Sequence, residues 1–196
     1  LALGTIDISS DGYATRYSAI PTIVPEGMKA GLVTVTEENK LLIDYCYGEG
    51  DVIPALTGVI LAAQEGTYPQ VFVAANTTVP TNNCLYGSLV DQETQAPQEE
   101  TEYSFYAFTR QNETLGFFWA AENGAAFTNK AGEAYLAIPK SETLQNGFSV
   151  NDLETGISNQ EMSVTHQRAT YDLQGRRVMR PSQGIYVQDG VLRLIK

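Results

Sequence analysis

Short segments typical of β-strands follow one another through the first 140 residues, at a spacing of about 8–12 residues. Residues 5–9 alternate apolar and polar side chains with the period of two of a half-buried strand. Residues 57–63 (TGVILAA) are almost continuously apolar and too short for a confident helix, so we expect the best-buried strand there. Residues 102–110 and 115–120 form a predicted hairpin. The sequence therefore predicts an all-β fold, with an antiparallel β-sandwich of about ten strands.

Three segments of different composition divide the chain. Residues 1–140 carry the series of strand signals and form the predicted sandwich body. Residues 141–168 are polar and weakly periodic, which indicates a linker. Residues 169–196 hold short apolar runs around turn signals, including the pair Asp189-Gly190 that favours a two-residue hairpin. We therefore expect a small C-terminal β-hairpin unit, separate from the sandwich.

Charge is distributed unevenly along the chain. Residues 1–167 hold six Lys and Arg against 21 Asp and Glu, which is a net charge of −15. Residues 168–196 hold six against two, which is +4, and the whole chain carries −11. The acidic body argues against nucleic acid and anionic membrane surfaces as partners. The sequence has no apolar run of roughly 18 residues, so we predict no transmembrane segment.

The chain contains two cysteines, Cys46 and Cys84, which are too few for a disulfide scaffold. In an exported protein they could pair and close a loop of about 38 residues, which would stabilise the fold by about 4 kcal/mol in the chain-entropy model. The alternative is a buried free thiol, because Cys46 lies within a predicted strand. The sequence leaves both possibilities open.

Residue types that commonly perform catalysis or hold cofactors lack the necessary spacing. Ser88 is not part of a Gly-x-Ser-x-Gly motif, and His166, the single histidine, lies in the predicted linker. A multi-histidine metal site is therefore nearly excluded, and no phosphate-binding or dinucleotide-binding loop occurs. Clustered acids such as Glu99 and Glu100 lie in a polar predicted loop rather than at the two sides of a sugar site. We predict no catalytic residue, no metal site and no cofactor, and hence a protein that is not an enzyme.

Aromatic side chains are the remaining feature with binding potential. Alternate residues of a strand point to the same side of a sheet, so Phe117 and Trp119 share one predicted face and Tyr45 and Tyr47 share another. Exposed tyrosine and tryptophan rings offer an electron-rich face to the C–H groups of a sugar. Packing within the core of the sandwich is the alternative use of the same rings. The candidate ligand-binding residues are Trp119, Phe117, Tyr45 and Tyr47.

The C-terminal phrases YDLQGRRV and GIYV, followed by a Gly turn and LRLIK, are similar to the C-terminal segment of many exported Bacteroidetes proteins, related to type IX secretion tails. In the body, VPEGMKAGLV, IPALTGVILAAQEGTY and GFFWAAENGAAFTNKAGEAYLAIP resemble a module of adhesin type in exported Bacteroidetes proteins. These resemblances imply an extracellular or outer-surface location and a protein or glycan partner there. They imply no catalytic residues.

Two functions from different classes follow as expectations. The first is a non-enzymatic secreted or cell-surface protein that adheres to, or binds, a ligand at the bacterial surface. The second is a glycan-binding accessory module of a polysaccharide-processing system, which the aromatic residues suggest.

Overall fold

The computed structural model describes residues 2–36, 40–141, 145–152, 154–156, 170–171, 177–178, 184–188 and 191–195. The chain forms two compact units, Leu1–Gly156 and Ile157–Lys196. In the described residues the only helical segments are two single 3-10 turns, Glu122–Gly124 and Val150–Asp152, and none could cross a membrane. The predicted all-β fold is confirmed.

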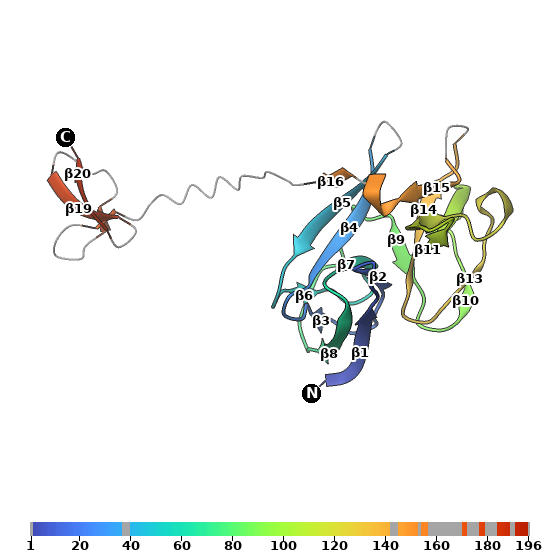
Figure 1. Ribbon diagram of the computed structural model, residues 1–196, viewed down its shortest axis with the longest axis horizontal. Coiled ribbons are helices and arrows are strands. Elements are labelled where there is room, and N and C mark those ends of the chain that lie inside the picture. The colour runs from blue at the N-terminus through green and yellow to red at the C-terminus, as the bar shows by residue number, and fades with distance from the viewer. Residues whose placement is uncertain are drawn as a thin grey trace. The chain divides into compact units, whose positions relative to one another are not determined.

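Three sheets, which we call A, B and C, make up most of the first unit (Figure 1). Sheet A has the strand order β1 (Ala2–Ile8), β8 (Gly66–Phe72), β3 (Thr22–Ile23) and β6 (Val52–Ile53). Sheet B has the order β16 (Glu154–Gly156), β5 (Leu41–Tyr47), β4 (Lys29–Val35), β7 (Val59–Ala62) and β2 (Tyr13–Arg16). Sheet C has the order β15 (Gly147–Ser149), β12 (Thr114–Phe118), β11 (Tyr103–Gln111), β14 (Ala134–Pro139) and β9 (Leu85–Gly87). Two short strands, β10 (Gln92–Glu93) and β13 (Thr128–Asn129), pair with each other.

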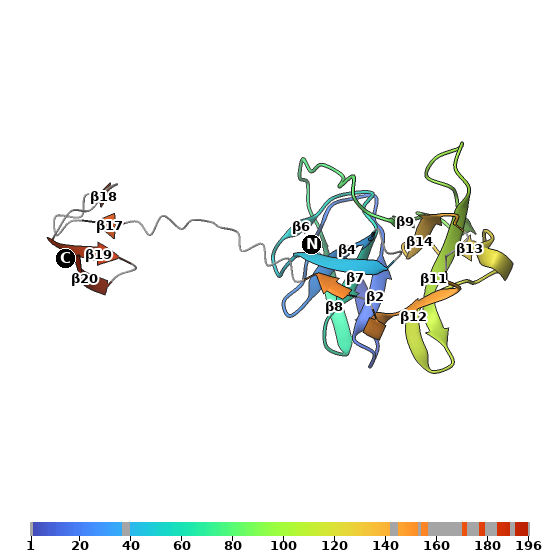
Figure 2. The same cartoon turned by 90° about the horizontal axis from the view of Figure 1, so that it is seen from above.

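Sheet B is the middle layer of three. Strands of sheets A and B lie on one side of the unit and those of sheet C on the other in both views (Figure 1, Figure 2). One apolar cluster joins Ile6 and Ile8 of sheet A to Leu61 of sheet B, and a second joins sheet B to sheet C. The sandwich-like arrangement therefore has two internal apolar layers instead of one.

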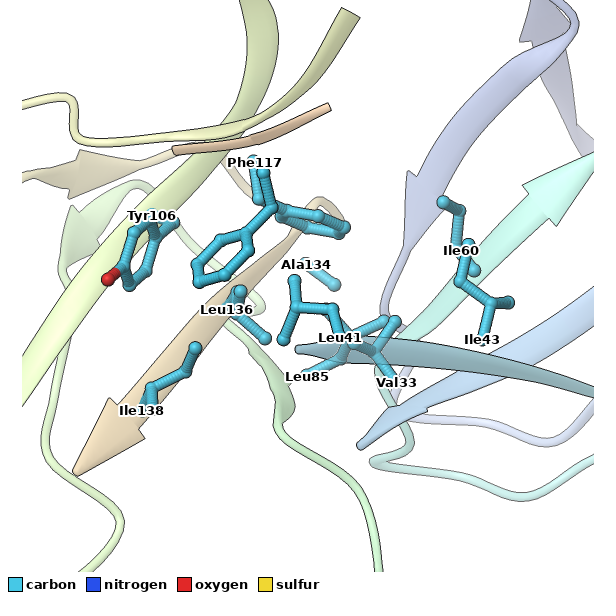
Figure 3. Close-up of a cluster of buried hydrophobic side chains, with 11 residues drawn as sticks. Val33, Leu41, Ile43, Ile60, Leu85, Tyr106, Phe117, Ala134, Leu136 and Ile138 are labelled. Carbon is cyan, nitrogen blue, oxygen red and sulfur yellow. The ribbon is translucent and has the colours of Figure 1, made fainter. Parts of the chain in front are cut away.

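The double burial explains the apolar run that sequence analysis singled out. All four residues of β7 are buried, as predicted for the best-buried strand. Leu61 packs in the cluster between sheets A and B, whereas its neighbour Ile60 packs in the cluster between sheets B and C. Figure 3 shows Ile60 on one side of this second cluster and Tyr106 and Phe117 of sheet C on the other. A strand covered on both faces needs apolar side chains at successive positions, not at alternate ones.

The first unit extends beyond residue 140, where the sequence placed the end of the body. Strand β15 pairs with β12 and buries Phe148, and β16 pairs in parallel with β5. Both strands fall inside the segment predicted as a linker, residues 141–168. Each is three residues long, so neither is long enough to give a periodic pattern. Most of that segment, including His166, lies outside the described residues.

The second unit contains one four-stranded sheet. Its order is β18 (Arg177–Val178), β17 (Thr170–Tyr171), β19 (Gly184–Gln188) and β20 (Val191–Ile195). Strands β19 and β20 pair antiparallel, with Gln188 opposite Val191. This register confirms the predicted hairpin, whose two turn residues lie outside the described residues.

Candidate ligand-binding groove

Three strands of sheet B bring a row of three side chains together at one end of the sheet. Tyr13 of β2 and Lys29 of β4 both lie opposite Ala62 of β7. Direct partners across an antiparallel pair point to the same face, and Ala62 shares its face with Ile60, two residues earlier. The row therefore lies on the face of sheet B that packs against sheet C further along the strands. The small side chain of Ala62 leaves a hollow between the two long ones.

An open groove of about 500 Å³ lies over this row. Its wall includes Asp11 and Gly12 from the β1–β2 turn, and Gly27 and Met28 from the turn before β4. Gly12 has a φ of 79°, and a Cβ atom there would lie 3.1 Å from the backbone oxygen of Ala63. Only glycine adopts this left-handed conformation at low cost and allows this close approach. Glycine-dependent turns therefore shape two sides of the groove.

A charged pair joins the groove to sheet C. Arg110, near the end of β11, donates from Nε to Asp11 Oδ2 over 3.1 Å and from Nη2 to Oδ1 of the same carboxylate. Its Nη1 also donates to the backbone oxygen of Glu113 at 2.7 Å. The two side chains are 50% and 20% exposed, so the pair contributes roughly 0–1 kcal/mol to stability. The bidentate contact with Arg110 fixes the carboxylate of Asp11 at the groove wall.

Lys29 places an ammonium group beside this wall. Its Nζ lies 4.0 Å from the centroid of the Tyr45 ring, a cation–π contact. In the part of the chain that the structure describes, no carboxylate lies within ion-pair distance of Lys29. Burial raises the pKa of Tyr45, and the charge and side-chain hydrogen bond of Tyr13 raise it further. Tyr13, Lys29 and Tyr45 thus form one connected group.

The prediction that Tyr45 and Tyr47 share a face is wrong. Leu32 lies opposite Asp44, whereas Ala30 lies opposite Tyr47, so β5 contains one more residue than β4 in this interval. Such a bulge shifts the alternation by one position. Tyr45 packs against the cluster between sheets B and C, whereas Tyr47 packs against the cluster between sheets A and B.

Phe117 lies in the interior between sheets B and C, whereas Trp119 packs against the same apolar cluster and stays partly exposed. Phe117 is 0% exposed, so its ring belongs to the core and no ligand can stack on it. Trp119 is partly buried against the same cluster, with its ring centroid 6.2 Å from that of Tyr106. Of the four candidate ligand-binding residues, only Tyr45 is connected to the groove. It contacts the lining residues Lys29 and Tyr13 but is not itself part of the lining. Asp11, Lys29 and Arg110 were not predicted as binding residues, because the sequence carries no signal for which strands become neighbours.

Cys46 and Cys84 are free thiols. Cys46 is exposed on β5, whereas Cys84 is half-buried against the core between sheets B and C, and its amide donates to the backbone oxygen of Val33 at 2.7 Å. Partial desolvation by neighbouring atoms raises the pKa of both thiols, also that of the exposed Cys46, where the charge of Asp44 adds to the effect. The raised pKa keeps both sulfurs protonated and weakly nucleophilic at neutral pH.

Among the described residues, no His, Cys, Asp or Glu side chains gather in a group of three or more that could hold a metal ion. No family model matches the sequence, and neither a curated protein nor a solved structure matches the chain significantly.

Proposed function

We propose that this chain is a non-enzymatic ligand-binding protein of adhesin type that acts outside the cell or on the outer surface of a bacterium. The observation that carries the binding role is the open groove at the end of sheet B. The groove has a volume of about 500 Å³, and its lining presents the ring of Tyr13, the ammonium of Lys29 and the carboxylate of Asp11. Ligand sites combine such a concave shape with a few oriented polar groups.

The binding role is tested by comparing Tyr13→Ala with Tyr103→Ala. Tyr13 lines the groove, whereas Tyr103 is a half-buried tyrosine on the outer face of sheet C. The wild type and both variants are applied to immobilised matrix proteins and to a glycan array. We expect Tyr13→Ala to lose most binding and Tyr103→Ala to keep it, with urea denaturation showing that both are folded. Equal loss in both variants would contradict the role of the groove, and hydrolysis of any glycan by the pure protein would contradict a non-enzymatic function.

The proposed location rests on the resemblance of the C-terminal phrases to type IX secretion tails. It is tested by fusing residues 157–196, a compact unit of its own, to a reporter protein behind a signal peptide in a Bacteroidetes host. We expect the reporter at the cell surface or in the medium. A reporter that stays in the periplasm, while one carrying a complete secretion tail leaves it, would overturn this assignment.

The alternative function is a glycan-binding accessory module. The observation that favours it is the hollow over Ala62, flanked by Tyr13 and Lys29, because a sugar ring needs both an aromatic face and polar partners. A response of the glycan array without binding to any matrix protein would favour this alternative.

A further inference from the structure

We infer that the groove binds a sugar that carries a carboxylate group, with the ammonium of Lys29 receiving the carboxylate and the ring of Tyr13 contacting the sugar face. This inference rests on the proposed binding function of the groove and adds the chemical class of its ligand. Uronic acids and sialic acids share this chemistry, a negatively charged carboxylate on a pyranose ring.

The charges around the groove favour an anion. Asp11 is the acidic residue of the groove lining, and the guanidinium of Arg110 already engages both of its oxygens. Lys29 is the basic residue of the lining and has no carboxylate partner among the described residues. The ammonium of Lys29 is therefore the charged group of the lining that is left for a ligand, while the carboxylate of Glu49 accepts a hydrogen bond from the amide of Gly27. This ammonium lies in a segment, residues 1–167, that holds six basic residues against 21 acidic ones.

The Lys29 ammonium is oriented but keeps its hydrogen-bonding capacity. The Tyr45 ring, 4.0 Å away, attracts the cation through its electron-rich face without accepting a conventional hydrogen bond. An ammonium group has three N–H donors, so a carboxylate can still receive hydrogen bonds from it. Holding a flexible lysine in this way reduces the rotamer freedom that would be lost on binding.

The neighbouring residues supply room and a surface for the sugar ring. Ala62 lies between Lys29 and Tyr13 in the row across three strands, and its side chain is a single methyl group. A pyranose ring placed over Ala62 can direct its C–H groups at the Tyr13 ring and its substituent carboxylate at Lys29. Hydrogen bonds to hydroxyl groups are available from the Asp11–Arg110 pair at the wall.

The test uses the full chain and pairs of ligands that differ in charge. Tetragalacturonate is compared with its methyl ester, and sialyllactose with lactose, by calorimetric titration at low ionic strength. We expect at least one acid to bind about fivefold more tightly than its neutral partner, which corresponds to one exposed charge pair. The preferred pair identifies a uronic or a sialic acid. Added salt should reduce the preference, because exposed charges are screened.

Lys29→Gln is the decisive variant, and Lys130→Gln is its matched control because Lys130 is also exposed but lies outside the groove lining. We expect Lys29→Gln to bind acid and neutral sugars alike and Lys130→Gln to keep the wild-type preference. Equal binding of acid and neutral sugars by the wild type, with loss in Tyr13→Ala, would overturn the inference and leave the proposed function standing. Binding to a matrix protein alone, with loss of that binding in Tyr13→Ala, would likewise overturn the inference and leave the proposed function standing. If Tyr13→Ala and Lys29→Gln both bind like the wild type, the inference and the binding role of the groove fail together.

Discussion

The same face of sheet B has two different ends. At one end Val33, Ile43 and Ile60 are at most 1% exposed and pack against sheet C. At the other end Tyr13, Ala62 and Lys29 occupy the same face, but an open groove lies over them. Strands β4 and β7 contribute to both ends, so one strand carries a core residue and a groove residue two positions apart.

The difference shows how this fold makes a binding surface without a separate element for it. Sheet C covers only part of the face, and the residues beyond its cover change from branched aliphatic to aromatic, small and charged. The covered end supplies rigidity, because close-packed side chains do not rearrange readily. Because β4 and β7 run through both ends, the packing at the covered end also holds the backbone of the open end in place. We therefore expect substitutions at the covered end to change stability and substitutions at the open end to change binding.

The largest expected effect is that of Ile60→Ala at the covered end. The substitution removes buried methyl groups from the core between sheets B and C, and we expect the free energy of unfolding to fall by about 2–5 kcal/mol. Urea denaturation measures this change. Lys29→Gln is the counterpart at the open end and should change the free energy of unfolding by less than about 0.5 kcal/mol. An equal loss of free energy of unfolding in Ile60→Ala and Lys29→Gln would contradict the proposed difference between the two ends.

Gly31→Ala probes the boundary between the two ends. A Cβ atom on Gly31 would lie 2.8 Å from Cγ2 of Ile43 and 3.0 Å from the backbone oxygen of Asp44, which is closer than such atoms normally approach. We expect a loss of about 1–3 kcal/mol from overpacking, measured by urea denaturation, together with weaker binding because the same Cβ lies 3.1 Å from the Tyr45 ring. Gly48→Ala is the control, since its nearest contact would be an ordinary 3.7 Å. Wild-type stability in Gly31→Ala would show that this boundary is loosely packed.

Alkaline pH provides a third test through Tyr45. Because its pKa is raised in the folded protein, the unfolded chain loses the phenol proton first, at about pH 10, while the folded chain retains it. The unfolded state then binds fewer protons, so the free energy of unfolding falls as pH rises above about 10 and is unaffected by this group below that pH. We expect a smaller fall in Tyr45→Phe, measured by urea denaturation across this range. An identical fall in both proteins would mean that Tyr45 ionises freely in the folded state.

The smallest expected effect is that of Arg110→Ala. Its pair with Asp11 is partly exposed, so we expect a loss of about 0.2–1 kcal/mol that shrinks at high salt. The effect on sugar binding should be larger than the effect on stability, because Asp11 loses the group that fixes its carboxylate. Thermal unfolding and calorimetric titration of the same sample separate the two effects. Unchanged sugar binding in Arg110→Ala would show that a fixed Asp11 carboxylate does not contribute to binding.

Local sequence patterns predicted the elements that depend on local chemistry. The apolar run at 59–62 became the fully buried β7, and the predicted hairpin appears as the antiparallel pair β11–β12. The C-terminal hairpin also follows its turn signal. In each case the strand and its turn lie within a few residues of each other, where period and turn chemistry act directly.

Features that depend on distant partners were not predictable in this way. The bulge in β5 is set by its register against β4, and it separates Tyr45 from Tyr47 although the sequence alternates regularly there. The groove depends on Asp11 meeting Arg110, which lies 99 residues further along the chain. The burial of Phe117 depends on sheet B covering that face of sheet C, and local sequence patterns do not specify which sheets pack together.

The parallel pairing of β16 with β5 has a consequence for the order in which the first unit can fold. Glu154 lies opposite Leu42, so the outer edge of the middle sheet is closed by residues more than a hundred positions later in the chain. Until those residues arrive, β5 presents unpaired backbone groups that could join a strand of another molecule. Contacts between such distant segments also slow folding, to milliseconds or seconds in all-β domains. The first unit should therefore be most prone to aggregation late in folding, when everything except its last strand is in place.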